Sequence, residues 1–464
     1  MKKILLSAFE SGSGKTTITA ALLRLLKEKG TDVTGIKCGP DYIDPMFHNF
    51  VLNDKNTGGM NVDIFLQGRD KAVDQVAGLN KEAAVFEGAM GYYDGIGGRW
   101  ENSAYDIART LDIPVILIVR PHGASLTLAA LIKGIAQFKT GSGIKGVILN
   151  DCRRSLYDHL KPIIEDETGI EVLGYVPHMK EAVIESRHLG LITAGEVTGL
   201  SEKIALISEA MKKSVNIERL IAIMEDGNNR RVREKGQTER SESGKSAGGY
   251  GSVRIAVAYD SAFCFYYRSS LNALRKAGAK IVFFSPLKDR GLPKDIQGLY
   301  IGGGYPELYL KELSDNISMK KEIKTAIDSG LPTIAECGGF MYLNEGIFDR
   351  NNEEKYEMVG IIRGNASFSG KLKRFGYIYL ENNSDKQNML FNEGERIPAH
   401  EFHYYDSDDS GEDLSASKAL GNTDYRCGFI NGSLYAGYPH LELSGEIPLA
   451  ERFVERAVRY GKQG

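Results

Sequence analysis

Short apolar runs alternate with helix-like segments along almost the whole chain, and this alternation restricts the fold more than any other feature of the sequence. Runs such as KKILLSAF, AAVFEG and IPVILIV in the first half, and VRIAVAY and GLYIGG in the second, are apolar at consecutive positions. Strands of this kind are buried on both faces, as in parallel sheets that carry helices on both sides. The sequence therefore predicts an α/β fold with doubly wound parallel sheets.

A polar segment separates the two series of apolar runs. Residues 225–252 consist mostly of glycine, serine, asparagine and charged residues. Such a segment buries too little apolar surface to offset the entropy lost on ordering. We therefore expect two α/β domains, residues 1–224 and residues 253–464, joined by a flexible linker over residues 225–252.

The composition argues against two classes of partner. The chain has 58 Lys and Arg against 61 Asp and Glu, a formal charge of −3, whereas nucleic-acid-binding proteins usually carry a basic excess. The longest apolar stretch after the N-terminal run, Ile113 to Val119, is far shorter than the ~20 residues of a membrane-spanning helix. Five scattered cysteines predict neither a disulfide framework nor a zinc site. We expect a cytoplasmic protein without a nucleic-acid or membrane partner.

A glycine-rich loop lies between the first apolar run and a helical pattern that ends at Gly30. In a strand–loop–helix arrangement of this kind, backbone N–H groups bind a polyphosphate, the lysine reaches the terminal phosphates and the following threonine binds Mg²⁺. The usual pattern GxxxxGK[ST] has a further glycine where this chain has Phe9. The predicted phosphate-binding residues are Gly12, Ser13, Gly14, Lys15, Thr16 and Thr17.

Carboxylates gather after the next predicted strands, in the segments GPDYIDP and EGAMGYYDG. Ligands of open parallel sheets bind beyond the carboxyl ends of the strands, where acidic groups can hold Mg²⁺ or position a reacting group. The alternative is that the aspartates only build turns. We take Thr16, Asp41 and Glu87 as candidate metal ligands, and Asp41, Asp44 and Asp94 as neighbours of the substrate or metal. The segment RHLGL, with Arg187 and His188, has no assigned role.

The second half contains a predicted strand-to-helix elbow at Cys337. The run LPTIAE reads as a buried strand, and Cys337 and Gly338 then lead directly into a helix start. An elbow exposes a thiol at a helix N-terminus, where the thiolate is favoured, although a lone cysteine is more often a buried apolar residue. The backbone N–H groups of Gly303, Gly304 and Gly338 are candidate donors to an oxyanion.

Two late segments offer a histidine as the base for this thiol. One contains His440, with Glu442 two residues later as a candidate third member of a triad. The other, HEFHY, contains His400 and His403. The spacing in the sequence does not choose between them.

The order of the motifs GSGKTT, GPDYIDP, EGAMGYYDG, RHLGL, GGGYPE, AECGG and HEFHY, followed by His440, resembles the cobyrinate a,c-diamide synthase family over almost everything outside the linker. The resemblance implies an ATP-using amide synthase domain like dethiobiotin synthetase, whose deviant P-loop accommodates Phe9, followed by a class I glutamine amidotransferase domain. It makes Cys337 the nucleophile and His440 its base. Family members often read His-x-His where this chain has His440-Leu441-Glu442, so a Cys–His–Glu triad stays open.

By the same resemblance, Asp41, Asp44, Glu87 and Asp94 surround ATP, Mg²⁺ and substrate. The implied chemistry is ATP-dependent amidation of the a and c acetates of a corrinoid through an acyl phosphate, with ammonia from glutamine. Two alternatives remain: a nickel-sirohydrochlorin a,c-diamide synthase of coenzyme F430 biosynthesis, and a P-loop switch ATPase with an inert glutaminase-like domain. The partners are then small molecules, and the oligomeric state, including a homo-oligomer, is open.

Overall fold

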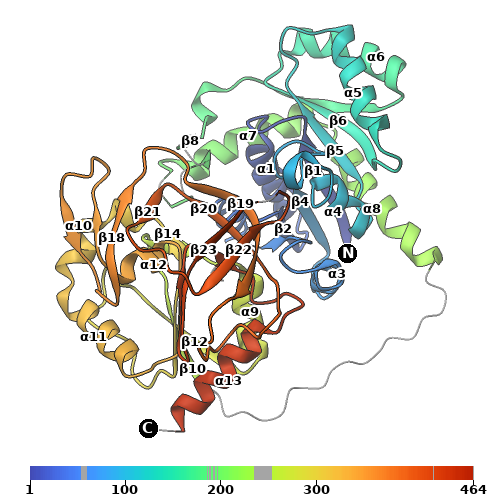
Figure 1. The fold of residues 1–464 in the computed structure, drawn as a ribbon. Coiled ribbons are helices and arrows are strands. Elements are labelled where there is room, and N and C mark those ends of the chain that lie inside the picture. Colours follow the sequence, from blue (N-terminus) through green and yellow to red (C-terminus); the bar gives the residue numbers. More distant parts are fainter. Residues whose placement is uncertain are drawn as a thin grey trace. The chain divides into compact units, whose positions relative to one another are not determined.

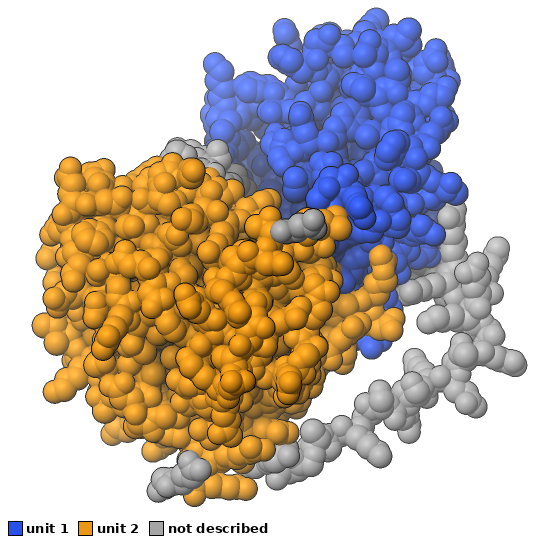
Figure 2. All heavy atoms as spheres, in the orientation of Figure 1, with its two compact units in different colours: residues 1–64, 72–242 blue, residues 65–71, 243–464 orange. Residues whose placement is uncertain are grey.

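The computed structural model of the protein describes residues 1–53, 60–184, 186–187, 190–191, 194–195, 197–234, 253–421 and 423–462. The chain divides into two compact units (Figure 2). Unit 1 comprises residues 1–64 and 72–242, and unit 2 comprises residues 65–71 and 243–464. Each unit contains a largely or wholly parallel sheet between helices (Figure 1), which confirms the predicted α/β class.

Within the described residues, unit 1 contains a seven-stranded parallel sheet with the order β3-β2-β4-β1-β5-β6-β7. Its strands are β1 (Lys2–Ala8), β2 (Val33–Cys38), β3 (Asn61–Val62), β4 (Ala83–Glu87), β5 (Val115–Val119), β6 (Ile144–Asn150) and β7 (Glu171–Val176). The helices are α1 (Lys15–Glu28), α2 (Asp44–Leu52), α3 (Arg69–Ala77), α4 (Ala104–Leu111), α5 (Leu126–Phe138), α6 (Arg154–Thr168), α7 (Leu200–Ser214) and α8 (Ile217–Glu234), with short 3-10 turns η1 (Ile96–Gly98) and η2 (Lys180–Ala182).

The helices of unit 1 cover both faces of the sheet. Side chains of α1, α2, α7 and α8 pack into one core cluster, and those of α3, α4, α5 and α6 into two clusters on the opposite face. The first strand shows why its sequence is continuously apolar: Ile4 and Leu6 face the first cluster, whereas Leu5 faces the second. Each such side chain contributes about 1.5–3 kcal/mol when fully buried, so both faces of the strand stabilise the unit.

Unit 2 is built on a six-stranded sheet in its described part, with the order β12-β10-β13-β15-β25-β24. All neighbours are parallel except β24, which is antiparallel to β25. The strands of this sheet are β10 (Val253–Ala258), β12 (Ala279–Phe284), β13 (Gly298–Ile301), β15 (Thr333–Glu336), β24 (Phe429–Ile430) and β25 (Leu434–Gly437). The predicted strands VRIAVAY, KIVFFS, GLYIGG and LPTIAE are β10, β12, β13 and β15.

Further sheets in this unit were not predicted from the sequence. They run in the orders β17-β16-β18-β21, β23-β22-β19-β20-β26 and β11-β14. Their strands are β11 (Phe263–Phe265), β14 (Gly303–Gly304), β16 (Asn344–Phe348), β17 (Lys355–Glu357), β18 (Ile362–Phe368), β19 (Arg374–Asn382), β20 (Ile397–His403), β21 (Tyr405–Ser407), β22 (Leu414–Lys418), β23 (Asp424–Cys427) and β26 (His440–Leu441).

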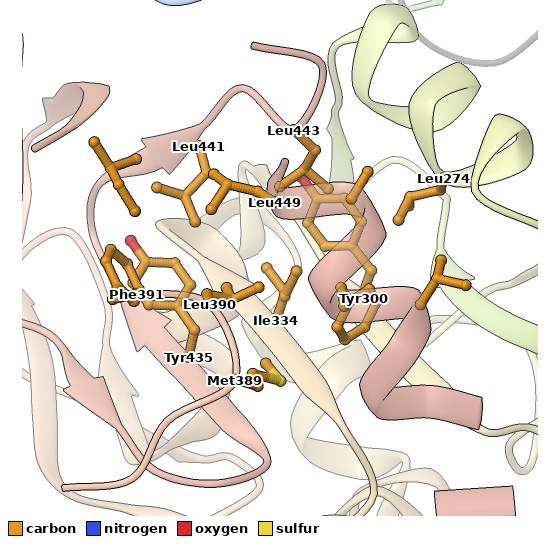
Figure 3. Packing of buried hydrophobic residues seen from close by; sticks show 14 of the residues in the cluster. Leu274, Tyr300, Ile334, Met389, Leu390, Phe391, Tyr435, Leu441, Leu443 and Leu449 are labelled. Atoms are coloured by element: carbon orange, nitrogen blue, oxygen red, sulfur yellow. The ribbon is translucent and has the colours of Figure 1, made fainter. Parts of the chain in front are cut away.

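The six-stranded sheet of unit 2 separates its core into two clusters, since successive residues of one strand, such as Ile255 and Ala256, belong to different clusters. One contains side chains from α9 (Arg268–Lys276) and α13 (Leu449–Gly461) and from β19, β20 and β22. Figure 3 shows part of this cluster, with Tyr300, Tyr435 and Leu441 among the packed side chains. The other cluster contains residues of the remaining helices, and β16 and β18 contribute to it as well. These helices are α10 (Leu310–Asp315), α11 (Ile317–Asp328) and α12 (Gly338–Leu343), preceded by the 3-10 turn η3 (Pro306–Leu308).

Two features differ from the division expected from the sequence. Residues 65–71 group with unit 2, because the ring of Phe65 lies 4.8 Å from that of Tyr377 and 5.0 Å from that of Tyr379. Helix α8 continues to Glu234, beyond the expected linker start at residue 225. The rest of the expected linker, residues 235–252, lies outside the described residues.

Among the helices of the described ranges, none is long and apolar enough to cross a membrane.

Candidate active sites

The phosphate-binding loop of unit 1 joins β1 to α1. Gly12 and Gly14 have φ values of 77° and 91°, a left-handed conformation that glycine adopts without strain. A Cβ atom on Gly14 would overlap Nδ2 of Asn150, which donates a hydrogen bond of 2.8 Å to the carbonyl of Ser13. Asn150, at the end of β6, therefore packs against the loop and holds it by this hydrogen bond. No local pattern in the sequence indicates this contact.

Lys15 begins α1, and its ammonium group binds two loops at once. Nζ donates to the carbonyl oxygens of Glu10, at 2.9 Å, and of Met90, at 2.7 Å. Burial, together with the nearby charge of Lys37, lowers the pKa of Lys15 to about 8. The predicted phosphate-binding lysine is thus connected to the loop that follows β4.

A buried ionic cluster lies beside this loop. Thr16 Oγ1 donates to Glu87 Oε1, at 2.6 Å, and lies 3.3 Å from Asp44 Oδ1. Lys37 Nζ forms ion pairs with Asp44 and, at 3.1 Å, with Glu87. His48 Nε2 lies 2.7 Å from the second oxygen of Glu87. The structure thus brings together the predicted Thr16, Asp44 and Glu87 and adds Lys37 and His48, which the sequence reasoning missed.

The charged groups of this cluster shift one another's pKa values. Burial opposes the charge of Lys37, but Asp44 and Glu87 outweigh it and raise the Lys37 pKa. Burial likewise opposes the charge of Glu87, yet Lys37 and His48 bring the pKa of this carboxyl well below its usual range. The pKa of Asp44 is raised by burial and by the neighbouring carboxylates Asp41 and Glu87. Lys37 is therefore a buried cation and Glu87 a buried anion.

The oxygen atoms of this cluster suit Mg²⁺, which prefers hard oxygen donors and keeps several waters or phosphate oxygens. Thr16, Asp44 and Glu87 present such atoms side by side. Asp41 is turned to its own loop, where Oδ1 accepts hydrogen bonds from the backbone N–H groups of Ile43 and Asp44. Within the described ranges, no group of three or more His, Cys, Asp or Glu side chains could hold a metal ion.

Asp94 belongs to the same loop as Met90, and its charge acts on Lys15, whereas the segment RHLGL contributes a separate pair of short strands. Asp94 Oδ2 accepts a hydrogen bond of 3.0 Å from the N–H of Gly91, within the turn that follows β4. Ser186–Arg187 and Gly190–Leu191 form the short antiparallel strands β8 and β9. His188 lies outside the described residues.

In unit 2, Cys337 occupies a strained elbow between β15 and α12. Its φ and ψ are 48° and −104°, a region that costs a non-glycine residue about 1–3 kcal/mol and often marks a functional site. Its N–H donates to the carbonyl of Gly437, at 2.8 Å, and its carbonyl accepts from the N–H of Met341. A Cβ on Gly338 would lie 2.9 Å from Pro306 Cδ, so the turn fits only glycine there. The predicted elbow is thus present.

The structure brings His440 to this cysteine. The two side chains are hydrogen-bonded, and the imidazole lies so close to Gly303 that a Cβ there would be 2.6 Å from Cε1. The same hypothetical Cβ on Gly338 would lie 3.1 Å from the N atom of Gly304. Although burial opposes it, the charges and hydrogen bonds of Cys337 and Glu336 raise the pKa of His440 to about 10. The predicted oxyanion donors Gly303, Gly304 and Gly338 thus lie around the thiol and imidazole.

Glu442 lies in a different environment from the one expected. Its carboxylate accepts hydrogen bonds from Ser269 Oγ at 2.7 Å, from Ser270 Oγ at 2.8 Å and from both N–H and Oγ of Ser444. Strand β26 ends at Leu441, so the alternation of a strand does not extend to Glu442, and its side chain binds the first turn of α9. The carboxylate beside His440 Nδ1, at 3.8 Å, belongs to Glu336.

The histidines of the segment HEFHY are buried near this site. His400 lies opposite His440 in the pairing of β20 with β26, and burial lowers its pKa to about 3. His403 stacks on Tyr438 with 3.9 Å between the ring centroids, and its Nδ1 donates to the carbonyl of Tyr405 at 2.6 Å. Burial lowers the pKa of His403 to about 4. Both imidazoles are therefore neutral at physiological pH.

Comparison with known families matches the two halves separately. Residues 4–191 match the CobQ/CobB/MinD/ParA nucleotide binding domain. Residues 254–446 match the CobB/CobQ-like glutamine amidotransferase domain. The first match contains the phosphate-binding loop and the ionic cluster, and the second contains the cysteine elbow and His440.

Curated relatives align with the chain over nearly its whole length. The cobyrinate a,c-diamide synthase of Clostridium tetani is 40% identical, over 98% of this chain and 100% of the relative. The enzymes of the same name from Caldanaerobacter subterraneus and Thermoplasma volcanium are 35% and 36% identical, each over 99% of this chain and over 99% and 98% of the relative. Both halves and their order are therefore shared with these relatives.

Proposed function

Because the chain belongs to the cobyrinate a,c-diamide synthase family, we propose that it amidates the a and c acetate carboxylates of cobyrinate in cobalamin biosynthesis, with ATP as energy source and glutamine as nitrogen donor. Family membership makes the chain a carbon–nitrogen ligase with a glutamine amidotransferase domain. The observation that carries the proposal is the similarity across both halves, each of which contains an intact candidate site.

In unit 1 the acetate would be activated by ATP. A carboxylate is a poor electrophile, so its oxygen takes the γ-phosphoryl group, which gives an acyl phosphate and ADP. Lys15 would exchange its bonds to the carbonyls of Glu10 and Met90 for phosphate oxygens. Thr16, Asp44 and Glu87 would hold Mg²⁺, which neutralises phosphate charge when bound. Ammonia then attacks the acyl carbon, and the amide forms as phosphate leaves.

In unit 2 glutamine would supply the ammonia. The Cys337 thiolate attacks the side-chain amide carbon, the backbone N–H groups of Gly304 and Gly338 stabilise the oxyanion, and His440 gives its proton to the departing ammonia. Water then hydrolyses the thioester to glutamate, with His440 accepting a proton from the water. Free ammonia bypasses these steps, so each half-reaction can be measured alone.

A substrate assay tests this function against its alternatives. The purified protein is supplied with ATP, Mg²⁺ and glutamine, and with either cobyrinate or nickel-sirohydrochlorin. Mass spectrometry then follows formation of the mono- and diamides. Amidation of cobyrinate alone supports the proposal, and amidation of only the nickel tetrapyrrole replaces it with the coenzyme F430 alternative. ATP hydrolysis that needs neither acceptor nor glutamine would favour a switch ATPase.

We expect ATP binding to weaken above pH 8, because Lys15 loses its proton there in the nucleotide-free protein. The phosphates bind the protonated ammonium, so binding above this pH must take up a proton. The dissociation constant of ATP should rise by only about twofold from pH 7 to 8 and then by at most about tenfold per pH unit. Isothermal titration calorimetry measures it, and the proton uptake appears as buffer-dependent heat.

Lys15→Arg is the control for this pH dependence. A guanidinium stays protonated throughout the range, so the variant should bind ATP with whatever affinity its geometry permits and without the rise above pH 8. A rise of equal size in both proteins would show that another group is responsible.

His440→Ala should abolish glutamine-supported synthesis selectively, because it removes the group that is hydrogen-bonded to Cys337. A general acid–base residue contributes about 10²–10⁴-fold, and ammonia-supported synthesis does not use it. His403→Ala is the comparison, since its imidazole is occupied by Tyr405 and Tyr438. That variant should lower stability or both activities together. A selective glutamine defect in His403→Ala, with His440→Ala unaffected, would reverse the assignment.

A further inference from the structure

Glu336 is the last residue of β15 and directly precedes Cys337. Its side chain is 1% exposed, and its backbone pairs with Gly437 of β25. The N–H of Cys337 donates to the carbonyl of that same Gly437. Glu336 is therefore fixed by the same two strands, β15 and β25, that position the elbow. Its carboxylate is buried beside the site and does not reach solvent.

The carboxylate of Glu336 is held from three sides. Oε2 lies 3.8 Å from His440 Nδ1 and accepts a hydrogen bond of 2.9 Å from the hydroxyl of Tyr300. Oε1 accepts a hydrogen bond of 3.0 Å from the N–H of Leu441. The ring of Tyr300 is packed in the core cluster beside Ile334 (Figure 3). The carboxylate is thus bonded both to the rigid core and to the backbone of the residue next to His440.

We propose that Glu336, rather than Glu442, positions His440 for glutamine hydrolysis: its carboxylate faces Nδ1, keeps the imidazolium in place, and leaves Nε2 for the thiol of Cys337. The proposal rests on the proposed function, since it assigns Glu336 a part in the glutaminase half-reaction. The 3.8 Å separation is an ion-pair distance, and hydrogen bonds of catalytic groups are often longer in the free protein than in the substrate complex.

The Glu442 carboxylate is not placed to position His440. Both of its oxygens are used by the hydroxyls of Ser269, Ser270 and Ser444, which fixes the turn after β26 to α9. The groups that affect the charge of His440 come from the elbow and from β20, and they are Cys337, Glu336, His400, Glu401 and His403. Of these, Glu336 is the carboxylate that forms an ion pair with the imidazole, at 3.8 Å from Nδ1.

Glu336→Gln tests the proposal, because it removes the charge and retains the shape. We expect kcat/KM for glutamine hydrolysis to fall on the order of 100-fold, the lower end of what acid–base groups contribute. The rate of Cys337 alkylation by iodoacetamide, followed by peptide mass spectrometry, should shift its midpoint upward by about one pH unit or more. Without the carboxylate the pKa of His440 falls, so less imidazolium is present to stabilise the thiolate. Ammonia-supported synthesis should stay within a few-fold of wild type.

Glu442→Gln is the matched control: it should lower Tm but leave the alkylation midpoint unchanged. Tyr300→Phe keeps the packed ring and removes one hydrogen bond to Glu336, so it should raise the alkylation midpoint by less than Glu336→Gln does. This variant tests the proposal if Glu336→Gln does not fold. An unchanged midpoint in Glu336→Gln or Tyr300→Phe, or a shift only in Glu442→Gln, would overturn the proposal. If the wild-type protein showed no ammonia-supported synthesis at all, that result would instead contradict the proposed function.

Discussion

We expect Cys337→Ser to abolish glutamine-supported synthesis and to leave ammonia-supported synthesis near the wild-type rate. A serine hydroxyl stays protonated at neutral pH and is a poor nucleophile towards an amide, so glutamine use should fall by roughly 10³-fold or more. The activation of the carboxylate in unit 1 does not involve the thiol. Synthesis is measured with glutamine and with ammonium chloride at equal ATP concentration.

Cys427→Ser is the matched control for this substitution. Cys427 is a buried thiol of the same unit, and burial raises its pKa to about 12, so it is unreactive at neutral pH. We expect this variant to use both nitrogen sources within a few-fold of wild type. An equal loss of both activities in a folded Cys337→Ser protein would mean that the thiol is structural.

The sequence predicts those parts of the sites that depend on local chain order. The phosphate-binding loop and the cysteine elbow each follow a strand and lead into a helix, so a few consecutive residues determine their geometry. Lys15 and Cys337 are therefore found without knowledge of the fold. The pairing of Cys337 with His440 needed the resemblance to a family, because the residues are far apart in sequence and local spacing does not select His440 over His403.

The sequence left open whether Glu442 completes a triad, because a position two residues after His440 does not determine where its side chain points. In the structure β26 ends at Leu441, and the Glu442 carboxylate binds Ser269 of α9 and Ser444 of its own turn. Glu336 has a different position in the sequence: it ends an apolar run, where a glutamate is unusual, and it precedes the nucleophile. A buried charge at such a position is the signal that could have indicated it.

Contacts between segments that are distant in the chain could not be predicted from the sequence. Lys37 lies in β2, and its partners Asp44 and Glu87 begin α2 and end β4. The grouping of residues 65–71 with unit 2 depends on rings more than 300 residues away, among them Tyr377. Neither leaves a periodic or compositional signal, so only the three-dimensional arrangement reveals them.

Lys15→Ala should abolish synthesis with both nitrogen sources, since both need the activated carboxylate. The ammonium group is a buried cation at the start of α1, and it binds the backbone carbonyls of Glu10 and Met90. Cations placed on a transferring phosphoryl group contribute on the order of 10³-fold or more. Glutamine hydrolysis at Cys337 should remain, because its residues belong to unit 2.

Lys29→Ala is the control on the same helix, because Lys29 stands just after α1 and forms an exposed ion pair with Glu218. Exposed pairs contribute at most about 1 kcal/mol, so this variant should retain synthesis and show only a small change in Tm. ATP consumption, glutamate release and amide formation are measured in parallel for the two variants. Normal ammonia-supported synthesis by Lys15→Ala would refute the phosphate-binding role of the loop. Loss of glutamine hydrolysis as well, in a folded protein, would show instead that the glutaminase reaction depends on nucleotide binding, because Lys15 itself belongs to unit 1.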